Sequence, residues 1–592
     1  MGEEKPGLRV EVQPGTEKKV PETEGFVGLA LETEGFMGLA LETLGLVGLA
    51  LVGPNRRKER RGEDRCSVAG EEATDRLKKT NDFLFSLTYA YGPALGWLLL
   101  LLPRQQQMAI ESAGFYLSGI SFLSIDCGIA GDNYTDDITK IFYTSDTKFI
   151  DTGTNKEIAA TYMTQTLPRR YQNLRIFPDG TRNCYTLTPV IKSNRYLLRA
   201  SFMYGNYDGL DRPPQFDAYV GVNRWEINLP SISSSRMWNE IIMVASLDYV
   251  SVCLVNTGKG TPYISALKLK HLNNLSYQAA NESQTLRLLY RNHFRQTASE
   301  TTIRYPDDAD DRIWSIWVRD GWTPINNSSP VNLWSQNDYQ LPLPVINTAV
   351  IPSDPNNNLT FSFPTSNGDP NLQYHIYMHC AELQQLKSSQ SREFNITING
   401  DLLYGPFSPE YLSGNTIFSV SPLSGQNQHE VVFSKTTSST LPPIFNAEEI
   451  FVLEPLSGTP TDSKDVDTIM NIKAVYQIKR NWMGDPCVPS FYIWEGLKCS
   501  YSKPPTIISL DLSSSGLTGV LAPSLVNFTS IQFLDVSNNS LTGPVPDFLA
   551  ELSSLKILKL TNNQFTGPIP AILLEKWKDG SLSLRLVYNA KP

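Results

Sequence analysis

Two groups of residues in this 592-residue chain have side chains of the types that perform chemistry, an acidic run and a histidine pair. The run PDDADD occupies residues 306–311, and glycoside hydrolases use two carboxylates that face each other across a cleft. Acids packed into one loop usually face water or hold a cation, so we expect a structural role. His375 and His379, followed by Cys380, are the residue types of a metal site. Strand residues four apart lie about 13 Å from each other, which is too far for easy shared ligation.

The sequence also argues against a serine hydrolase and against a nucleic-acid-binding protein. The sequence contains no GxSxG nucleophile elbow, and no Ser/His/Asp set can be assigned. The net charge is −9, and the compact basic run at residues 56–61 lies in an N-terminal extension instead of on a predicted domain. We therefore predict no catalytic residue, no metal, no other cofactor and no nucleic-acid partner, and we expect that the chain is not an enzyme.

Aromatic side chains around the sequence YGNYDG point to carbohydrate binding instead. Sugars stack on aromatic rings, and a few polar groups fix their orientation. The candidate ligand-binding residues are Tyr204, Tyr207, Asp208 and Trp225. The alternative is that Trp225 is a core residue and that the two tyrosines pack within the loop.

Sequons and cysteines indicate the secretory pathway. Nine Asn-x-Ser/Thr sequons occur, all after residue 120. Without Cys66 the chain has six cysteines, an even number that suits an oxidising compartment. Cys487 and Cys499 close a short loop, and we predict a disulfide between them. The pairing of the remaining four is left open. The predicted glycosylation sites are Asn133, Asn274, Asn281, Asn326, Asn327, Asn358, Asn395, Asn527 and Asn538, and the unassigned cysteines are Cys127, Cys184, Cys253 and Cys380.

Residues 1–119 form an irregular N-terminal extension. A short apolar run at 94–102 follows Lys78 and Lys79 and has the length of a signal-peptide core, although a signal anchor over 85–103 is the alternative. Ahead of it lies a ten-residue repeat of the type EGFVGLALET. We exclude this region from the prediction of the fold.

The stretch 121–460 reads as many short strands separated by turn residues, which predicts β-sandwich or jelly-roll architecture. An internal duplication is visible. YLLRASF at Tyr196 and FDAYVGVN at Phe216 are followed 178 residues later by YHIYMHC at Tyr374 and FNITING at Phe394. Two copies of one β-domain explain this pattern. In the first copy, Leu198, Ala200 and Phe202 would share one buried face.

A second repeat has a period of 24 residues, as at Leu510, Leu534 and Leu558. This is the leucine-rich-repeat pattern, with Asn539 and Asn563 at the turn position. Three repeats over 506–578 need a cap at their open end. Residues 461–505, with a helix and the sequence GDPC, are the candidate cap, and 579–592 would be a short truncated tail.

Several motifs together resemble plant malectin-like leucine-rich-repeat receptor-like kinases: FLSIDCG, YTSDTKFIDTG, QFDAYVGVNRW, RYPDDADDRIW and NWMGDPCVP. The resemblance implies malectin-like domains at 120–290 and 300–460, followed by the cap and the repeats. The family continues into a transmembrane helix and a kinase domain, and neither an HRD nor a DFG motif is present here.

The resemblance implies extracellular ligand recognition at the plant plasma membrane. We expect a cell-wall carbohydrate or a peptide or protein ligand, and a co-receptor. A cleft between the sandwiches and the strand face of the repeats are candidate surfaces. A secreted carbohydrate-binding protein or soluble decoy is the alternative, and a carbohydrate-active enzyme using the acidic run is a third. Residues expected on or beside the repeat face are Ser509, Asp511, Gln532, Asp535, Lys556 and Lys559.

Overall fold

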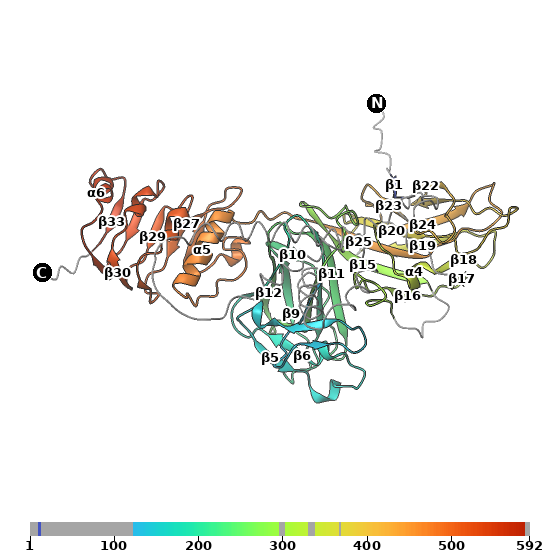
Figure 1. Cartoon of the computed structure of the whole chain (residues 1–592), viewed down its shortest axis with the longest axis horizontal. Helices are drawn as coiled ribbons and strands as arrows, with labels where there is room; N and C mark the ends of the chain where they lie inside the picture. Colours follow the sequence, from blue (N-terminus) through green and yellow to red (C-terminus); the bar gives the residue numbers. More distant parts are fainter. Residues whose placement is uncertain (1–9, 14–121, 295–301, 329–337, 366–368, 587–592) are drawn as a thin grey trace, which may run out of the picture. The chain divides into compact units, whose positions relative to one another are not determined.

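The computed structural model describes residues 10–13, 122–294, 302–328, 338–365 and 369–586. The apolar segment at 94–102, the alternative anchor and Cys66 therefore lie outside the described residues. Described residues fall into two β-sandwiches and a repeat stack (Figure 1). No helix among them is long and apolar enough to cross a membrane.

The first sandwich packs two mainly antiparallel layers over an apolar core. Strand β8 (Arg195–Met203) is buried along its whole length. Its residues Leu198, Ala200 and Phe202 share this core, as predicted. The expectation of a half-buried strand is wrong, because the opposite face is buried as well. One layer contains β2 (Phe122–Asp126), β3 (Tyr134–Thr135), β4 (Phe142–Ser145), β8, β11 (Arg236–Val244) and β14 (Ala266–His271); the other contains β7 (Arg182–Leu187), β9 (Gln215–Val220), β10 (Asn223–Trp225) and β12 (Val250–Lys259). Flanking elements are η1 (Asp146–Lys148), β5 (Thr154–Glu157), η2 (Ala160–Tyr162), η3 (Arg169–Tyr171), β6 (Asn173–Ile176) and β13 (Tyr263–Ile264).

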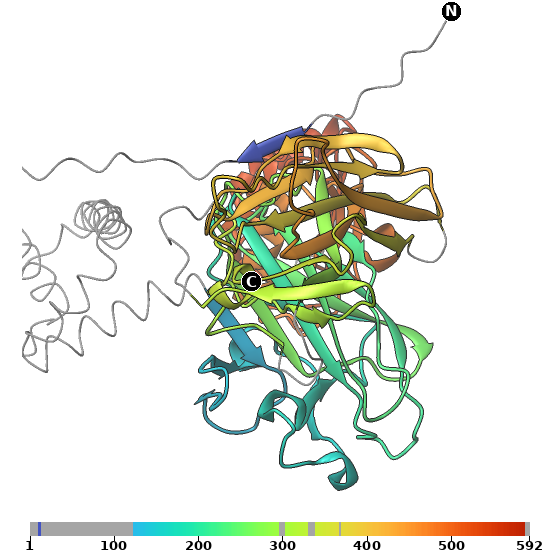
Figure 2. The same ribbon diagram turned by 90° about the vertical axis from the view of Figure 1, so that its right-hand side faces the viewer.

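The second sandwich repeats this plan around its own core. Strand β1 (Val10–Gln13) pairs with its edge strand β23, as Figure 2 shows. One layer contains β20 (Gln373–Cys380), β23 (Asn415–Ser419) and β25 (Ala447–Pro455); the other contains β19 (Leu359–Pro364), β21 (Phe394–Ile398), β22 (Asp401–Phe407) and β24 (Gln428–Lys435). Flanking elements are β16 (Ser315–Trp317), β17 (Trp322–Asn326), α4 (Leu343–Ile346) and β18 (Thr348–Pro352).

Strand β15 (Gln284–Phe294) joins the two sandwiches into one continuous sheet. It pairs with β11 of the first sandwich and with β25 of the second (Figure 1). The domain boundary predicted between residues 290 and 300 begins within this strand. Backbone hydrogen bonds therefore hold the two sandwiches together.

The cap attaches to the first sandwich through Arg182. Its guanidinium donates to the backbone carbonyls of Asp485, Val488 and Tyr492, at 2.8, 3.1 and 3.0 Å. Gly484 of the GDPC sequence has φ +67°, and a Cβ there would lie 3.0 Å from the sulfur of Cys184. Only glycine suits both the backbone conformation and this close approach.

Two disulfides are present. The predicted Cys487–Cys499 bridge closes the cap, and Cys184–Cys253 links directly opposed positions of β7 and β12. Cys127 and Cys380 are buried and are not in disulfides.

The larger sheet of the repeat stack contains four parallel strands, β27, β29, β31 and β33, instead of the three that the repeats predict. Strand β33 (Ser583–Arg585) pairs with β31, so part of the predicted tail at 579–592 belongs to the stack. Its Leu584 lies opposite Leu558, at 26 residues instead of 24, because helix α6 lengthens the return. The elements are α5 (Ser463–Val475), η6 (Ser490–Tyr492), β26 (Leu497–Cys499), β27 (Ile507–Asp511), β28 (Thr518–Gly519), η7 (Pro523–Asn527), β29 (Phe533–Asp535), β30 (Ser540–Pro544), η8 (Asp547–Glu551), β31 (Ile557–Lys559), β32 (Gln564–Thr566), α6 (Ala571–Lys578) and β33.

Asn539 ties successive repeats together. Its Oδ1 accepts hydrogen bonds from the backbone N–H groups of Ser515 and Leu517, both at 3.0 Å. Its Nδ2 donates to the carbonyls of Leu512 and Val536, both at 2.9 Å. One amide side chain thus satisfies backbone groups that the short strands leave unpaired.

We expect Asn539→Ala to lower the free energy of unfolding of the repeat stack by about 2–3 kcal/mol, because several part-buried backbone groups would lose their partners. Chemical denaturation followed by tryptophan fluorescence measures this change. The exposed amide of Gln564 serves as control, and Gln564→Ala should change the value by less than about 0.5 kcal/mol. Equal effects of both substitutions would contradict the assigned role of Asn539.

Candidate ligand-recognition surfaces

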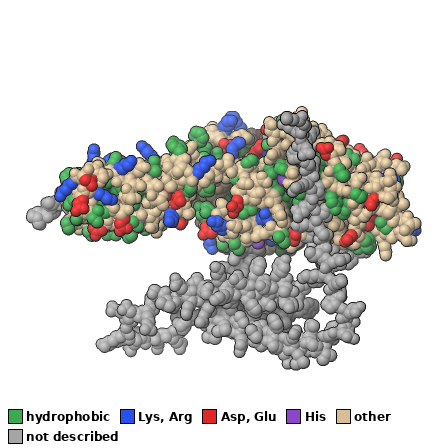
Figure 3. All heavy atoms as spheres, turned by 90° about the horizontal axis from the view of Figure 1, so that it is seen from above, with side chains coloured by type: hydrophobic (Ala, Val, Ile, Leu, Met, Phe, Trp, Pro, Cys, Tyr) green, Lys and Arg blue, Asp and Glu red, His purple; other side chains and the backbone are tan. Residues whose placement is uncertain are grey.

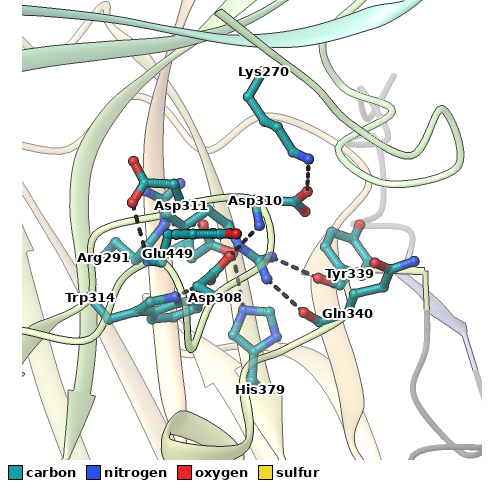
Figure 4. A network of polar contacts seen from close by, with 12 residues as sticks. Lys270, Arg291, Asp308, Asp310, Asp311, Trp314, Tyr339, Gln340, His379 and Glu449 are labelled. Atoms are coloured by element: carbon teal, nitrogen blue, oxygen red, sulfur yellow. Dashed lines mark hydrogen bonds and ion pairs between the residues drawn. The ribbon is translucent and has the colours of Figure 1, made fainter. Parts of the chain in front are cut away.

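The acidic run 306–311 forms a structural turn beside the joint of the two sandwiches (Figure 4). Asp308 is fully buried and accepts hydrogen bonds from Arg312 Nε at 2.9 Å and Trp314 Nε1 at 2.7 Å. Its other oxygen accepts the backbone N–H of Asp310 at 2.9 Å. This carboxylate is engaged on both oxygens, so it is not poised as a general acid or base.

The second buried carboxylate of the run, Asp311, collects several cations. It accepts from Arg199 Nη1 at 2.8 Å and from Arg304 Nε at 3.0 Å, and Lys268 Nζ also bonds to it. The backbone N–H of Tyr305 donates to it at 3.1 Å. Burial alone would raise its pKa, but these neighbouring cations hold the pKa of Asp311 well below its usual range. Asp311 therefore stays ionised as a structural anion.

A chain of buried ion pairs crosses from one sandwich to the other (Figure 4). Arg291 on β15 donates to Glu240 of β11 at 2.7 Å and to Glu449 of β25 at 2.6 Å. All three side chains are fully buried. Glu449 also accepts the hydroxyl of Tyr277 at 2.7 Å. Although burial would raise the pKa of Glu449, Arg291 and His379 hold that pKa below its ordinary value.

The two candidate histidines lie inside the sandwich and have separate partners. His379 lies 2.9 Å from the hydroxyl of Thr416 and 3.3 Å from Glu449. His375 lies 3.3 Å from the hydroxyl of Ser419, and burial lowers its pKa to about 4. Within the described ranges, no group of three His, Cys, Asp or Glu side chains could hold a metal ion. These histidines support the β-layer instead.

The aromatic loop proposed for carbohydrate is largely closed. The Tyr204 side chain is buried, and its hydroxyl bonds to the Asp208 carboxylate. Tyr207 is half-buried and donates to the carbonyl of Thr261 at 3.2 Å. Both rings pack against Tyr263, with centroids 6.1 and 5.8 Å away. Asp208 is exposed, so this loop offers polar groups more readily than an open ring face.

Trp225 makes none of these loop contacts. It is 2 % exposed on β10, and its Nε1 is buried without a hydrogen-bond partner. It lines a cavity of about 560 Å³ that also contacts Met243 of the sandwich and Met483 of the cap. Sequence patterns give no sign of this cavity, because its walls come from segments more than 200 residues apart.

The strand face of the repeats is only partly available. Ser509 and Asp535 are buried, and Asp535 pairs with Lys559 at 2.9 Å. Lys556 is exposed, whereas Asp511 and Gln532 are half-buried, as is Lys559. Fewer residues of the strand face are therefore accessible to a partner than the sequence indicated.

We expect Arg291→Met to lower the free energy of unfolding of the joined sandwiches by about 3–5 kcal/mol, because it leaves buried carboxylates without their main counter-ion. Thermal unfolding followed by circular dichroism measures the loss. Arg224 forms an exposed pair with Asp217, with side chains 62% and 31% accessible. Arg224→Met should therefore cost at most about 1 kcal/mol. A similar cost for both variants would refute the proposed role of the buried chain.

The buried carboxyl of Glu448 makes the stability of the fold depend on pH. It is 1 % exposed, one oxygen accepts from Asn292 at 3.0 Å, and burial raises its pKa from 4.5 to about 7. The folded state therefore keeps a proton that the unfolded chain releases. Its contribution to stability is full below pH 4.5 and is lost as the pH rises to about 7.

Glu448→Gln, which keeps the neutral form, should become more stable relative to wild type as the pH rises from about 4 to 8, by about 3 kcal/mol. Unfolding free energies at the two pH values measure this difference. The exposed Glu430 is the control, and Glu430→Gln should leave the profile unchanged. A flat difference between Glu448→Gln and wild type would overturn the assignment.

Comparison with known proteins places these features in a family. The malectin-like domain model matches residues 125–453, and the leucine-rich-repeat model matches 530–552 and 554–575. Neither is a kinase model. The ANX2 ectodomain of Arabidopsis thaliana aligns with 19% identity and a TM-score of 0.46, over 56% of this chain and 97% of that chain.

Two curated relatives come from Arabidopsis thaliana. The probable LRR receptor-like serine/threonine-protein kinase At1g05700 is 45% identical over 421 residues, 69% of this chain and 48% of the relative. The putative kinase of the same type At2g19230 is 44% identical over 471 residues, 78% of this chain and 53% of the relative. The chain thus spans about half the length of these relatives. It belongs to the malectin-like family and is similar to the malectin-like and leucine-rich-repeat region of plant receptor-like kinases.

Proposed function

We propose that this chain is the extracellular ligand-recognition region of a plant receptor-like kinase. The observation that carries the proposal is the malectin-like match over residues 125–453, together with relatives named as receptor-like kinases. The geometry supports binding more than chemistry, because the buried acids and histidines are engaged in contacts within the sandwiches. In this function, a ligand outside the cell contacts the sandwiches, and a co-receptor contacts the repeats.

Surface features support passage through the secretory pathway. Each of the nine sequon asparagines is exposed or half-exposed, so a glycosyltransferase could reach it. The disulfides at Cys184–Cys253 and Cys487–Cys499 suit an oxidising compartment. A secreted malectin-like carbohydrate-binding protein or soluble decoy would share these properties, and it remains the alternative function.

Two classes of ligand would use different residues of the sandwiches. A cell-wall carbohydrate would use Tyr207 and the exposed Asp208, with Tyr204 beneath them and Trp225 as a separate contact. A peptide or protein ligand would instead use polar and charged groups, which are interspersed over the face shown in Figure 3. The closed rings of the loop favour the peptide, because stacking needs an accessible ring face.

The test is to screen the full chain, produced in a eukaryotic secretory host, against a glycan array and a secreted-peptide library side by side. We expect a saturable ligand in at least one screen. If the ligand is a glycan, Tyr207→Ala should weaken binding by about tenfold. The exposed Tyr411 of the second sandwich is the matched control, and Tyr411→Ala should leave affinity unchanged. Absence of any ligand for correctly folded, secreted protein would contradict the proposal.

A further inference from the structure

The first sandwich contains a cavity of about 240 Å³ whose wall is strongly basic. Arginines and one lysine reach it from η3, from three strands of one layer and from the segment after residue 302. These residues are Arg170, Arg199, Arg236, Lys268 and Arg304. They are scattered over more than 130 positions of the sequence, so no basic run marks them.

Carboxylates neutralise only part of this charge. Arg199, Lys268 and Arg304 share Asp311, and Arg199 also contacts Glu240 at 2.9 Å. These three cations are therefore held in the buried network. The ion pairs fix these three side chains, which therefore have little freedom to move toward a ligand.

Arg170 and Arg236 lack close counter-ions. Arg170 is 9 % exposed, its nearest carboxylate is Asp136 at 3.9 Å, and its Nη1 is buried without a hydrogen-bond partner. Arg236 is exposed, and its side chain makes no hydrogen bond or ion pair within the described part of the chain. A buried guanidinium with unused donors is costly unless an anion completes it. These two side chains therefore supply the free donors of the cavity.

The aromatic residues of the wall restrict what can enter. Tyr143 and Tyr171 are buried, and Trp238 is half-buried with the Arg199 guanidinium 5.5 Å from its ring centre. Their ring faces are therefore poorly available for stacking of a sugar ring. Arginine recognises compact oxyanions through paired N–H donors. An extended side chain that ends in an oxyanion therefore fits this cavity better than a pyranose ring does.

We propose that this basic pocket binds the carboxylate of an acidic side chain on a peptide ligand, with Arg170 and Arg236 as the contacting residues. The inference rests on the proposed extracellular recognition function and narrows its ligand class to an acidic peptide. Network residues Arg199 and Arg304 set the positive potential, whereas burial lowers the pKa of Lys268 well below its usual range. The two contacting residues both line the cavity, Arg170 as a buried side chain and Arg236 as an exposed one, and the anion would contact both.

The probe is a fluorescein-labelled peptide of alternating glutamate and glycine, and fluorescence anisotropy measures its binding to the full chain. The same peptide with glutamine in place of glutamate is the uncharged control. Trigalacturonate, as an unlabelled competitor, represents an acidic glycan. Arg170→Gln and Arg236→Gln are compared with Arg212→Gln, because Arg212 is an exposed arginine of the same sandwich outside the pocket.

We expect the glutamate peptide to bind, the glutamine peptide not to bind, and affinity to fall as salt rises. Arg170→Gln and Arg236→Gln should each weaken binding about tenfold, and Arg212→Gln less than about twofold. If Arg170→Gln fails to fold, the exposed Arg236→Gln still decides the question.

Equal losses of affinity in all three variants, or binding of the glutamine peptide, would overturn the proposal that this pocket binds the peptide. Displacement by trigalacturonate at lower concentration than by unlabelled glutamate peptide would overturn the choice of a peptide. In either case, a ligand recovered from the library screen would leave the recognition function standing. Failure of both the screen and the glutamate peptide would count against that function itself.

Discussion

The burial of Arg291 is the constraint on which the rest of this structure depends. A fully buried guanidinium is tolerated only when carboxylates surround it. Here those carboxylates come from Glu240 of one sandwich and Glu449 of the other, on the strands that flank β15. A slip in either ladder would leave an ion unpaired in the interior. The ion pairs therefore select one register for the continuous sheet, and so one arrangement of the two sandwiches.

The same network explains why the acids of the run 306–311 have a structural role instead of a catalytic one. Asp308 and Asp311 are engaged by cations and by backbone N–H groups on several sides. Asp311 is a single anion shared by three cations, which leaves the neighbouring cavity positive. The network thus fixes the joint and, as a by-product, leaves Arg170 and Arg236 beside it without close counter-ions.

Much of the fold could be predicted from local sequence patterns. The shared core face of Leu198, Ala200 and Phe202, the mainly β architecture with leucine-rich repeats and the Cys487–Cys499 bridge are confirmed. Each depends on residues that are close in sequence or repeat at a fixed spacing. The sharing of β15 depends on pairing with β25, about 160 residues away, and no local pattern reports such a ladder. Strand β33 was missed because helix α6 changes the repeat length.

The candidate site was harder to predict, because a sequence does not show which polar atoms are already hydrogen-bonded in the folded chain. The sequence YGNYDG has the aromatic and acidic residues of a sugar site, but Tyr204 uses its hydroxyl on Asp208 and Tyr207 uses its own on Thr261. A motif cannot show whether its polar atoms are already engaged. Arg170 and Arg236 belong to no motif, yet folding leaves their donors unused. A binding site is therefore better recognised by unsatisfied groups in the folded chain than by residue types in the sequence.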